Sequence, residues 1–179
     1  MKKILFLAPA LVALLVLTSG CKKVLGLLEF NVEDSQTITV PRTVPFGQFF
    51  PLSPVTVPSS SKNTYSNNGT SADYVQDVTL DKLTLTITNP QGQNFDFLKR
   101  IEVYISTTAQ GTDKVLLASL SPVPTGTSSI SLTPANQKLD AFLRSDSYTL
   151  TTNVELAKPL GQDITIRADS RFKVKARKP

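Results

Sequence analysis

Residues 164–177 have the sequence ITIRADSRFKVKAR, in which apolar and polar side chains alternate almost without interruption. Side chains of a β-strand point alternately to its two faces, so this period of two predicts a long strand with one buried and one solvated face. The face predicted to be buried carries Ile164, Ile166, Ala168, Phe172, Val174 and Ala176. The opposite face carries Thr165, Asp169 and a stripe of basic residues: Arg167, Arg171, Lys173, Lys175 and Arg177.

We expect this basic stripe to be a solvated face that also protects a sheet edge, because cationic side chains discourage edge-to-edge association. Asp163 and Asp169 belong to the same face and dilute its positive field. The alternative interpretation is contact with anionic head groups or an acidic polymer, since the basic residues are adjacent and of one sign. Both interpretations stay open at the level of the sequence.

The same alternation recurs along the chain and predicts an all-β protein. Apolar residues at period two, bounded by turn residues, occur in residues 28–33, 37–40, 78–88, 95–105, 130–132, 148–156 and 164–177, and the more uniformly apolar residues 115–120 predict a more fully buried strand. The first two segments form either a hairpin or one strand with a break at Asp34-Ser35, and the last two are expected to pair as an antiparallel hairpin. A change of phase near Asp81-Lys82 indicates a bulge. Seven or eight short strands predict an antiparallel β-sandwich or open barrel.

Two segments depart from this pattern. Residues 134–144 have apolar side chains at helical spacing after a Thr133-Pro134 start, which predicts one short helix. Residues 41–72 are rich in Pro, Ser, Asn and Gly and predict a long irregular loop. Within it lie Phe46, Phe49 and Phe50, which we expect to pack the loop onto the core. Alternatively they form an exposed apolar contact for a ligand, lipid or partner.

The N-terminus has the layout of an export signal. Met1-Lys2-Lys3 is followed by an apolar run from Ile4 to Leu17, too short for a membrane span, and then by Thr18-Ser19-Gly20-Cys21. Residues 17–21 resemble the lipobox of bacterial lipoprotein signal peptides, with Thr18 where Leu is usual. The resemblance implies removal of residues 1–20 and acylation of Cys21, the only cysteine in the chain. It further implies a lipid-anchored protein of the cell envelope, for which we favour the outer membrane.

The domain organisation follows from this interpretation. Residues 1–20 are a cleaved signal peptide, residues 21–26 a lipidated tether, and residues 27–179 a single β-sandwich domain of ordinary size. Within that domain, the Leu-Thr-Leu-Thr-Ile-Thr-Asn-Pro run of residues 83–90 faintly resembles the late-embryogenesis-abundant/water-stress β-sandwich family. That resemblance covers a small part of the chain and implies only a β-sandwich.

The composition argues against catalysis. The chain has no histidine, and its single cysteine is assigned to acylation, so the commonest general base, metal ligand and thiol nucleophile are missing. Its glutamates, among them Glu102 and Glu155, occupy strand positions predicted to face water. A formal charge of +5 is too small to indicate nucleic-acid binding.

We therefore expect no enzyme, no cofactor and no metal, but a membrane-anchored structural or interaction module. The alternative is a carrier of an apolar, lipid-like ligand, which would need an apolar cavity in the domain.

Overall fold

The computed structural model describes residues 26–179, so the predicted signal peptide and Cys21 lie outside the described residues. The nine strands are β1 (Leu28–Val40), β2 (Phe49–Pro51), β3 (Val55–Pro58), β4 (Val75–Asn89), β5 (Leu98–Ser106), β6 (Val115–Leu120), β7 (Ser129–Pro134), β8 (Ser147–Leu156) and β9 (Ile164–Ala176). Two short α-helices, α2 (Ser61–Asn67) and α3 (Asp140–Arg144), and two 3-10 turns, η2 (Ala72–Tyr74) and η3 (Phe95–Phe97), complete the described chain. Within these residues no helix is long and apolar enough to cross a membrane.

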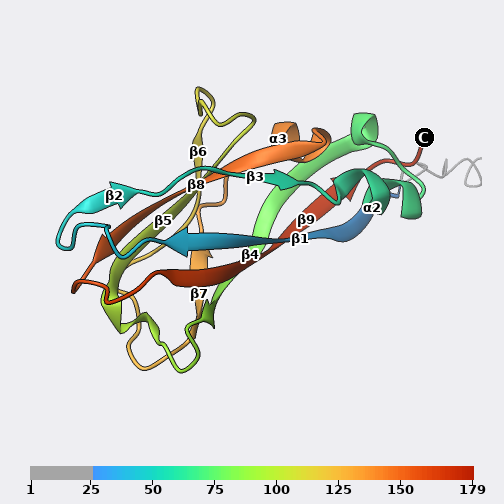
Figure 1. Cartoon of the computed structure of the whole chain (residues 1–179). Coiled ribbons are helices and arrows are strands. Elements are labelled where there is room, and N and C mark those ends of the chain that lie inside the picture. The colour runs from blue at the N-terminus through green and yellow to red at the C-terminus, as the bar shows by residue number, and fades with distance from the viewer. Residues whose placement is uncertain (1–25) are drawn as a thin grey trace, which may run out of the picture.

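The strands form one curled sheet in the order β1-β9-β4-β7-β6-β5-β8-β2, with β3 also pairing to β8. All pairings between these strands are antiparallel. The sheet curls into a half-barrel, so that β3 and β8 near one end of the strand order face β1 and β9 at the other end (Figure 1). Tyr148 of β8 accordingly packs edge-on against Phe172 of β9, with ring centroids 5.9 Å apart. The predicted all-β class with an open barrel is thus confirmed.

Strand β9 lies between β1 and β4, and its predicted alternation is confirmed. The six apolar residues assigned to its inner face, from Ile164 to Ala176, are all buried. The predicted hairpin with residues 148–156 is wrong, because β8 pairs with β5, β2 and β3 in the other half of the sheet. Period-two patterning identifies the two faces of a strand but does not indicate which strands lie beside it. Strand β9 can form backbone hydrogen bonds along both of its edges only between two long strands.

The predicted change of phase in β4 is also confirmed. Leu80 pairs with Phe172 and Lys82 with Arg171, so Asp81 is the extra residue of a bulge against β9. The bulge keeps Leu80 and Leu83 both buried although they have opposite parity in the sequence. Together with the inner side chains of β9, they belong to one continuous hydrophobic core.

Strand β1 is a single strand through Asp34 and Ser35, without the turn that we considered there. Asp34 has the same parity as Val32 and Ile38 and therefore points inward, where its side chain is only 9% exposed. Pairing with β9 is continuous from Leu28 to Val40, and this ladder holds the Asp-Ser pair extended. Pairing with β9 thus outweighs the turn propensity of the Asp34-Ser35 dipeptide.

Three boundaries differ from the sequence predictions. The helix begins at Asp140 rather than at residue 134, because Pro134 still pairs with Ala118 and the Ala135 amide donates to the Leu117 carbonyl oxygen at 3.0 Å. Residues 41–72, predicted to be an irregular loop, contain β2, β3 and α2. Glu102 was predicted to face water but is 8% exposed, because β6 and β8 flank it on both sides.

Candidate binding face

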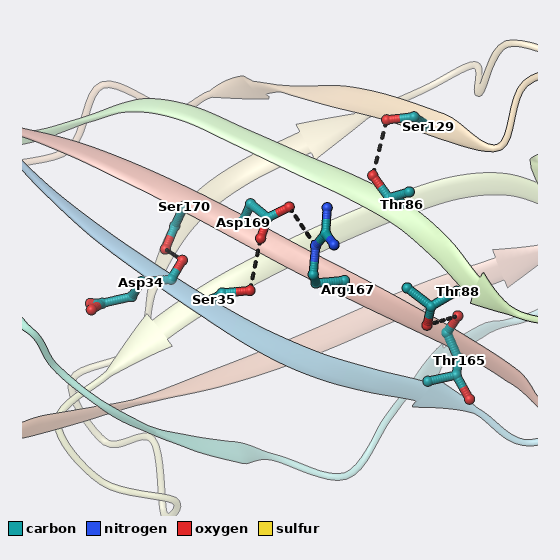
Figure 2. A network of polar contacts seen from close by, with 9 residues as sticks. All are labelled: Asp34, Ser35, Thr86, Thr88, Ser129, Thr165, Arg167, Asp169 and Ser170. Carbon is teal, nitrogen blue, oxygen red and sulfur yellow. Dashed lines mark hydrogen bonds and ion pairs between the residues drawn. The ribbon is translucent and has the colours of Figure 1, made fainter.

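The outer surface of the β1-β9-β4-β7 half of the sheet is covered with hydroxyl and charged side chains. Cross-strand pairing aligns them in rows, one running through Ser35, Asp169, Thr84 and Ser131 and the next through Thr37, Arg167, Thr86 and Ser129. We call this surface, made of these eight residues together with Thr88 and Thr165, the polar face. Figure 2 shows most of these side chains on four neighbouring strands.

Direct hydrogen bonds hold the side chains of the polar face in place. Asp169 accepts from Ser35 Oγ at 2.7 Å and from Arg167 Nε at 2.9 Å (Figure 2). The Thr86 and Ser129 hydroxyls lie 3.1 Å apart and share one hydrogen bond. Each bond links neighbouring strands or successive outward positions, so the polar face presents a fixed pattern of donors and acceptors.

The carboxylate of Asp169 is held in its charged form by these partners. Partial burial raises its pKa, but the hydrogen bonds from Ser35 and Arg167 and the positive charge of Arg167 outweigh burial. The net result is a pKa below the usual value for aspartate. At neutral pH the centre of the polar face therefore carries a compensated Asp–Arg pair.

A shallow hollow of about 420 Å³ lies within this surface. Glu33 and Lys82 bound it on one side, and Thr86 and Arg167 line it on the other. Asp34 and Ser170 also contribute to its lining. A hollow of this size with mixed charge and several hydroxyls can accept a polar segment through several hydrogen bonds at once.

The predicted basic stripe runs the length of β9 beside this hollow, and most of its members have an acidic neighbour. Arg171 Nε lies 2.6 Å from Asp81 Oδ2, and Lys175 Nζ lies 3.7 Å from Glu29 Oε1. Arg167 pairs with Asp169 as described, and the Arg177 guanidinium faces the Gln76 side-chain amide. Lys173 is exposed and has no carboxylate within 4.0 Å in the part of the chain that the structure describes. This pairing favours the solvated-face interpretation of the stripe. Its expected role in protecting a sheet edge is wrong, because β9 lies between β1 and β4 and is not an edge strand.

The three phenylalanines of the 41–72 segment do not pack into the core as expected. Phe46, Phe49 and Phe50 are 57%, 40% and 39% exposed. Phe49 pairs with Glu155 and Phe50 with Val154, so the two rings leave opposite faces of β2. The Phe49 ring lies 4.7 Å from the guanidinium carbon of Arg100, whereas Phe50 lines an open groove of about 430 Å³ between β1 and the β2–β3 segment. Phe49 and Phe50 are close in the sequence but therefore belong to two different surfaces of the domain.

Sequence reasoning missed a buried polar node centred on Asp34. Its carboxylate accepts hydrogen bonds from the Ser60 amide at 2.8 Å and from Tyr148 Oη at 3.0 Å. Burial and the neighbouring Asp34 charge raise the pKa of Tyr148, so this tyrosine stays protonated. The signal was present in the sequence, because Asp34 continues the even-numbered phase of Phe30, Val32 and Ile38.

A second missed cluster surrounds the buried Glu102. Tyr104 Oη donates to Glu102 Oε2 at 2.6 Å, and Arg100 Nη2 donates to Glu102 Oε1. The hydrogen bond to Glu102 raises the pKa of Tyr104. The three residues alternate along β5, so the pattern i, i+2, i+4 of Arg, Glu and Tyr was its sequence signal. Its charge is internally paired, and it leaves no free base.

Among residues 26–179, no group of three or more His, Cys, Asp or Glu side chains lies close enough together to hold a metal ion. Comparison of the chain with models of known protein families and with curated proteins finds no match.

Proposed function

We propose that the protein is a lipid-anchored, non-catalytic interaction module of the bacterial cell envelope, and that the polar face is where it binds. The observation that carries the proposal is the hydrogen-bonded array of hydroxyls and compensated charges around the 420 Å³ hollow. Threonines at successive outward positions have few rotamers to lose, so binding to them costs little side-chain entropy. Such a surface suits a hydrogen-bonding partner of low net charge.

The interior supports a module rather than a carrier. Core positions on both halves of the half-barrel are filled by large side chains that are less than 2% exposed, among them Phe95, Phe97, Leu83 and Phe172. A lipid-like ligand needs a cavity of several hundred Å³ lined mainly by apolar atoms. Here the hollow on the polar face is lined by hydroxyls and charges instead.

The anchor is argued from the sequence alone. Cys21 follows Ser19-Gly20 at the end of a short apolar run, and acylation of a sole cysteine gives it a use in an exported chain. When cells are extracted and the detergent phases are separated, Cys21→Ser should move the protein from the detergent-rich phase to the detergent-poor phase. Unchanged partitioning would contradict the anchor.

Position-resolved photo-cross-linking in cells tests the binding face. A photoreactive phenylalanine analogue at Thr86, on β4, should give a discrete cross-linked product. The same analogue at the exposed Gln110, in the loop between β5 and β6, serves as the matched control and should give none. Arg167→Glu should abolish the Thr86 product, because it reverses one charge of the compensated pair. Equal products at both positions, or a product that survives Arg167→Glu, would refute the polar face as the site.

A second candidate function rests on the groove beside Phe50. Its lining includes Phe50, Pro51 and Val55 together with the hydroxyls of Thr37 and Thr39, and it is open along the free edge of β1. An acyl chain could lie there with Phe50 as a cover, which is the carrier alternative. Native mass spectrometry of the protein purified without detergent tests it: a lipid adduct lost in Phe50→Ser would favour the carrier.

A further inference from the structure

One end of the half-barrel combines exposed apolar side chains with cations that lack a carboxylate partner. Leu28 of β1 and Val75 at the start of β4 both pair with Ala176 of β9. One residue further out, Leu27, Arg177 and Tyr74 therefore lie side by side on three neighbouring strand ends. The Arg177 amide donates to the Tyr74 carbonyl oxygen at 3.0 Å, and this hydrogen bond holds residues 74 and 177 next to each other. Figure 1 shows the C-terminus, α2 and the start of β1 at this end.

The apolar side chains at this end are unusually accessible. Leu27 is 49% exposed and Tyr74 is 40% exposed, and they belong to the few large hydrophobic residues of residues 26–179 that are exposed to this degree. Tyrosine has an apolar ring and a polar hydroxyl, and it is enriched at the boundary between lipid and water. An exposed tyrosine and an exposed leucine at the same end of the sheet, on either side of Arg177, are thus suited to the surface layer of a bilayer.

Cations are found at the same end of the domain. Arg144 and Arg177 line a hollow of about 490 Å³ together with Tyr74, Gln76 and Asp73. Arg144, Arg177 and the exposed Lys178 have no carboxylate within 4.0 Å among the described residues. Asp73 opposes them in the hollow, and Glu29 is engaged by Lys175 at 3.7 Å. In and around this hollow, three cations without a carboxylate of residues 26–179 within 4.0 Å therefore face one lining carboxylate, that of Asp73.

The tether places this same end next to the membrane if Cys21 is acylated. Residues 22–26 are all that separates Cys21 from Leu27, and fully extended they span at most about 18 Å. The opposite end, where β9 begins at Ile164, is about 40 Å away along this 13-residue strand. The cationic end thus stays within reach of the head groups while the domain is anchored.

We infer that Leu27, Tyr74, Arg144, Arg177 and Lys178 form a docking surface that seats the domain, anchored end down, on a bilayer containing anionic lipids. This inference rests on the proposed lipid anchor and adds a defined orientation to it. The arginines bind lipid phosphates in the hollow, and Leu27 and Tyr74 enter the head-group layer. Docked in this way, the strands stand away from the membrane, and the polar face remains open to a partner.

The chain has no tryptophan, so a single introduced tryptophan reports its own contact with lipid. We would compare Tyr74→Trp with Gln162→Trp, the control at the far end of β9, in the full acylated protein reconstituted into vesicles with acyl-brominated lipids. In vesicles of phosphatidylcholine and phosphatidylglycerol, emission of the Tyr74→Trp variant should be quenched several-fold more strongly than that of Gln162→Trp. With phosphatidylcholine alone the difference should shrink, and raising the salt concentration should shrink it as well.

Arg177→Gln with Lys178→Gln in the Tyr74→Trp background should reduce quenching at least twofold. Lys99→Gln with Lys114→Gln, which removes the same charge from β5 and from the loop before β6 in the other half of the sheet, should leave quenching unchanged. Flotation of the vesicles separates the two hypotheses. A protein that floats but shows equal quenching at both positions, or none at residue 74, refutes the docking surface alone. A protein that does not float refutes the anchor, and the docking geometry derived from it falls too.

Discussion

Replacing the buried Asp34 by alanine should destabilise the domain strongly, although the same change at Asp169 should not. Asp34 Oδ1 accepts from the Ser60 amide at 2.8 Å, and Asp34 Oδ2 accepts from Tyr148 Oη at 3.0 Å. In Asp34→Ala both donors lose their acceptor inside the protein, and each buried unsatisfied donor costs about 1–3 kcal/mol. Removing a buried carboxylate also removes its desolvation cost, which offsets part of this loss. We expect the free energy of unfolding to fall by about 3 kcal/mol.

The matched control is Asp169→Ala on the outer face of β9. Asp169 also accepts two hydrogen bonds, from Ser35 Oγ and Arg167 Nε, but its partners reach water. Such exposed pairs contribute about 0–1 kcal/mol. For a domain of this size 1 kcal/mol corresponds to about 2–4 °C in Tm, so Asp34→Ala should lower Tm by about 6–12 °C and Asp169→Ala by no more than about 4 °C.

Urea unfolding and thermal melts followed by far-ultraviolet circular dichroism measure both variants. Hydrogen exchange supplies a second readout, because the Ser60 amide should lose protection in Asp34→Ala while amides in the middle of β9 keep theirs. Equal losses of stability in the two variants, or a loss below 1 kcal/mol for Asp34→Ala, would refute the assignment of Asp34 as the node that ties α2 and β8 to β1.

Three further predictions concern burial, ionisation and surface charge. Phe95→Ala, at a fully buried ring, should cost about 3–5 kcal/mol, whereas Phe49→Ser should cost under about 1.5 kcal/mol because that ring is already 40% exposed; chemical unfolding compares them. Burial raises the pKa of Tyr65 to about 12 and that of Tyr148 in the same direction. Stability from these two phenols is therefore fully present below pH 10 and lost as pH rises above it, so absorbance at 295 nm should show their ionisation only together with unfolding. Arg171→Gln should change the free energy of unfolding by less than about 1 kcal/mol, since its contact with Asp81 is solvent-exposed; a larger loss in a urea titration would mean that the pair is structural.

The sequence predicted which side chains of the candidate site share one face of a strand, but it did not predict which strands lie next to each other. Alternation assigned Thr84, Thr86 and Thr88 to a polar face of one strand and Arg167 and Asp169 to that of another. Nothing local to either strand indicates that they are neighbours, because strand order depends on long-range pairing. The register of β4 against β9 sets Thr86 opposite Arg167, and that of β1 against β9 sets Ser35 opposite Asp169.

The sequence by itself determined the strand class, the inner face of β9 and the bulge at Asp81, because these follow from side-chain periodicity within one segment. It also carries the whole argument for acylation at Cys21, since a processing signal is a linear motif. Only the tertiary structure decided that β9 lies between β1 and β4, that Asp34 points into the core, and that Leu27, Tyr74 and Arg177 meet at one end. Those outcomes depend on which strands share backbone hydrogen bonds, and backbone donors and acceptors are the same in every residue except proline, so the pairing leaves no mark in the local pattern.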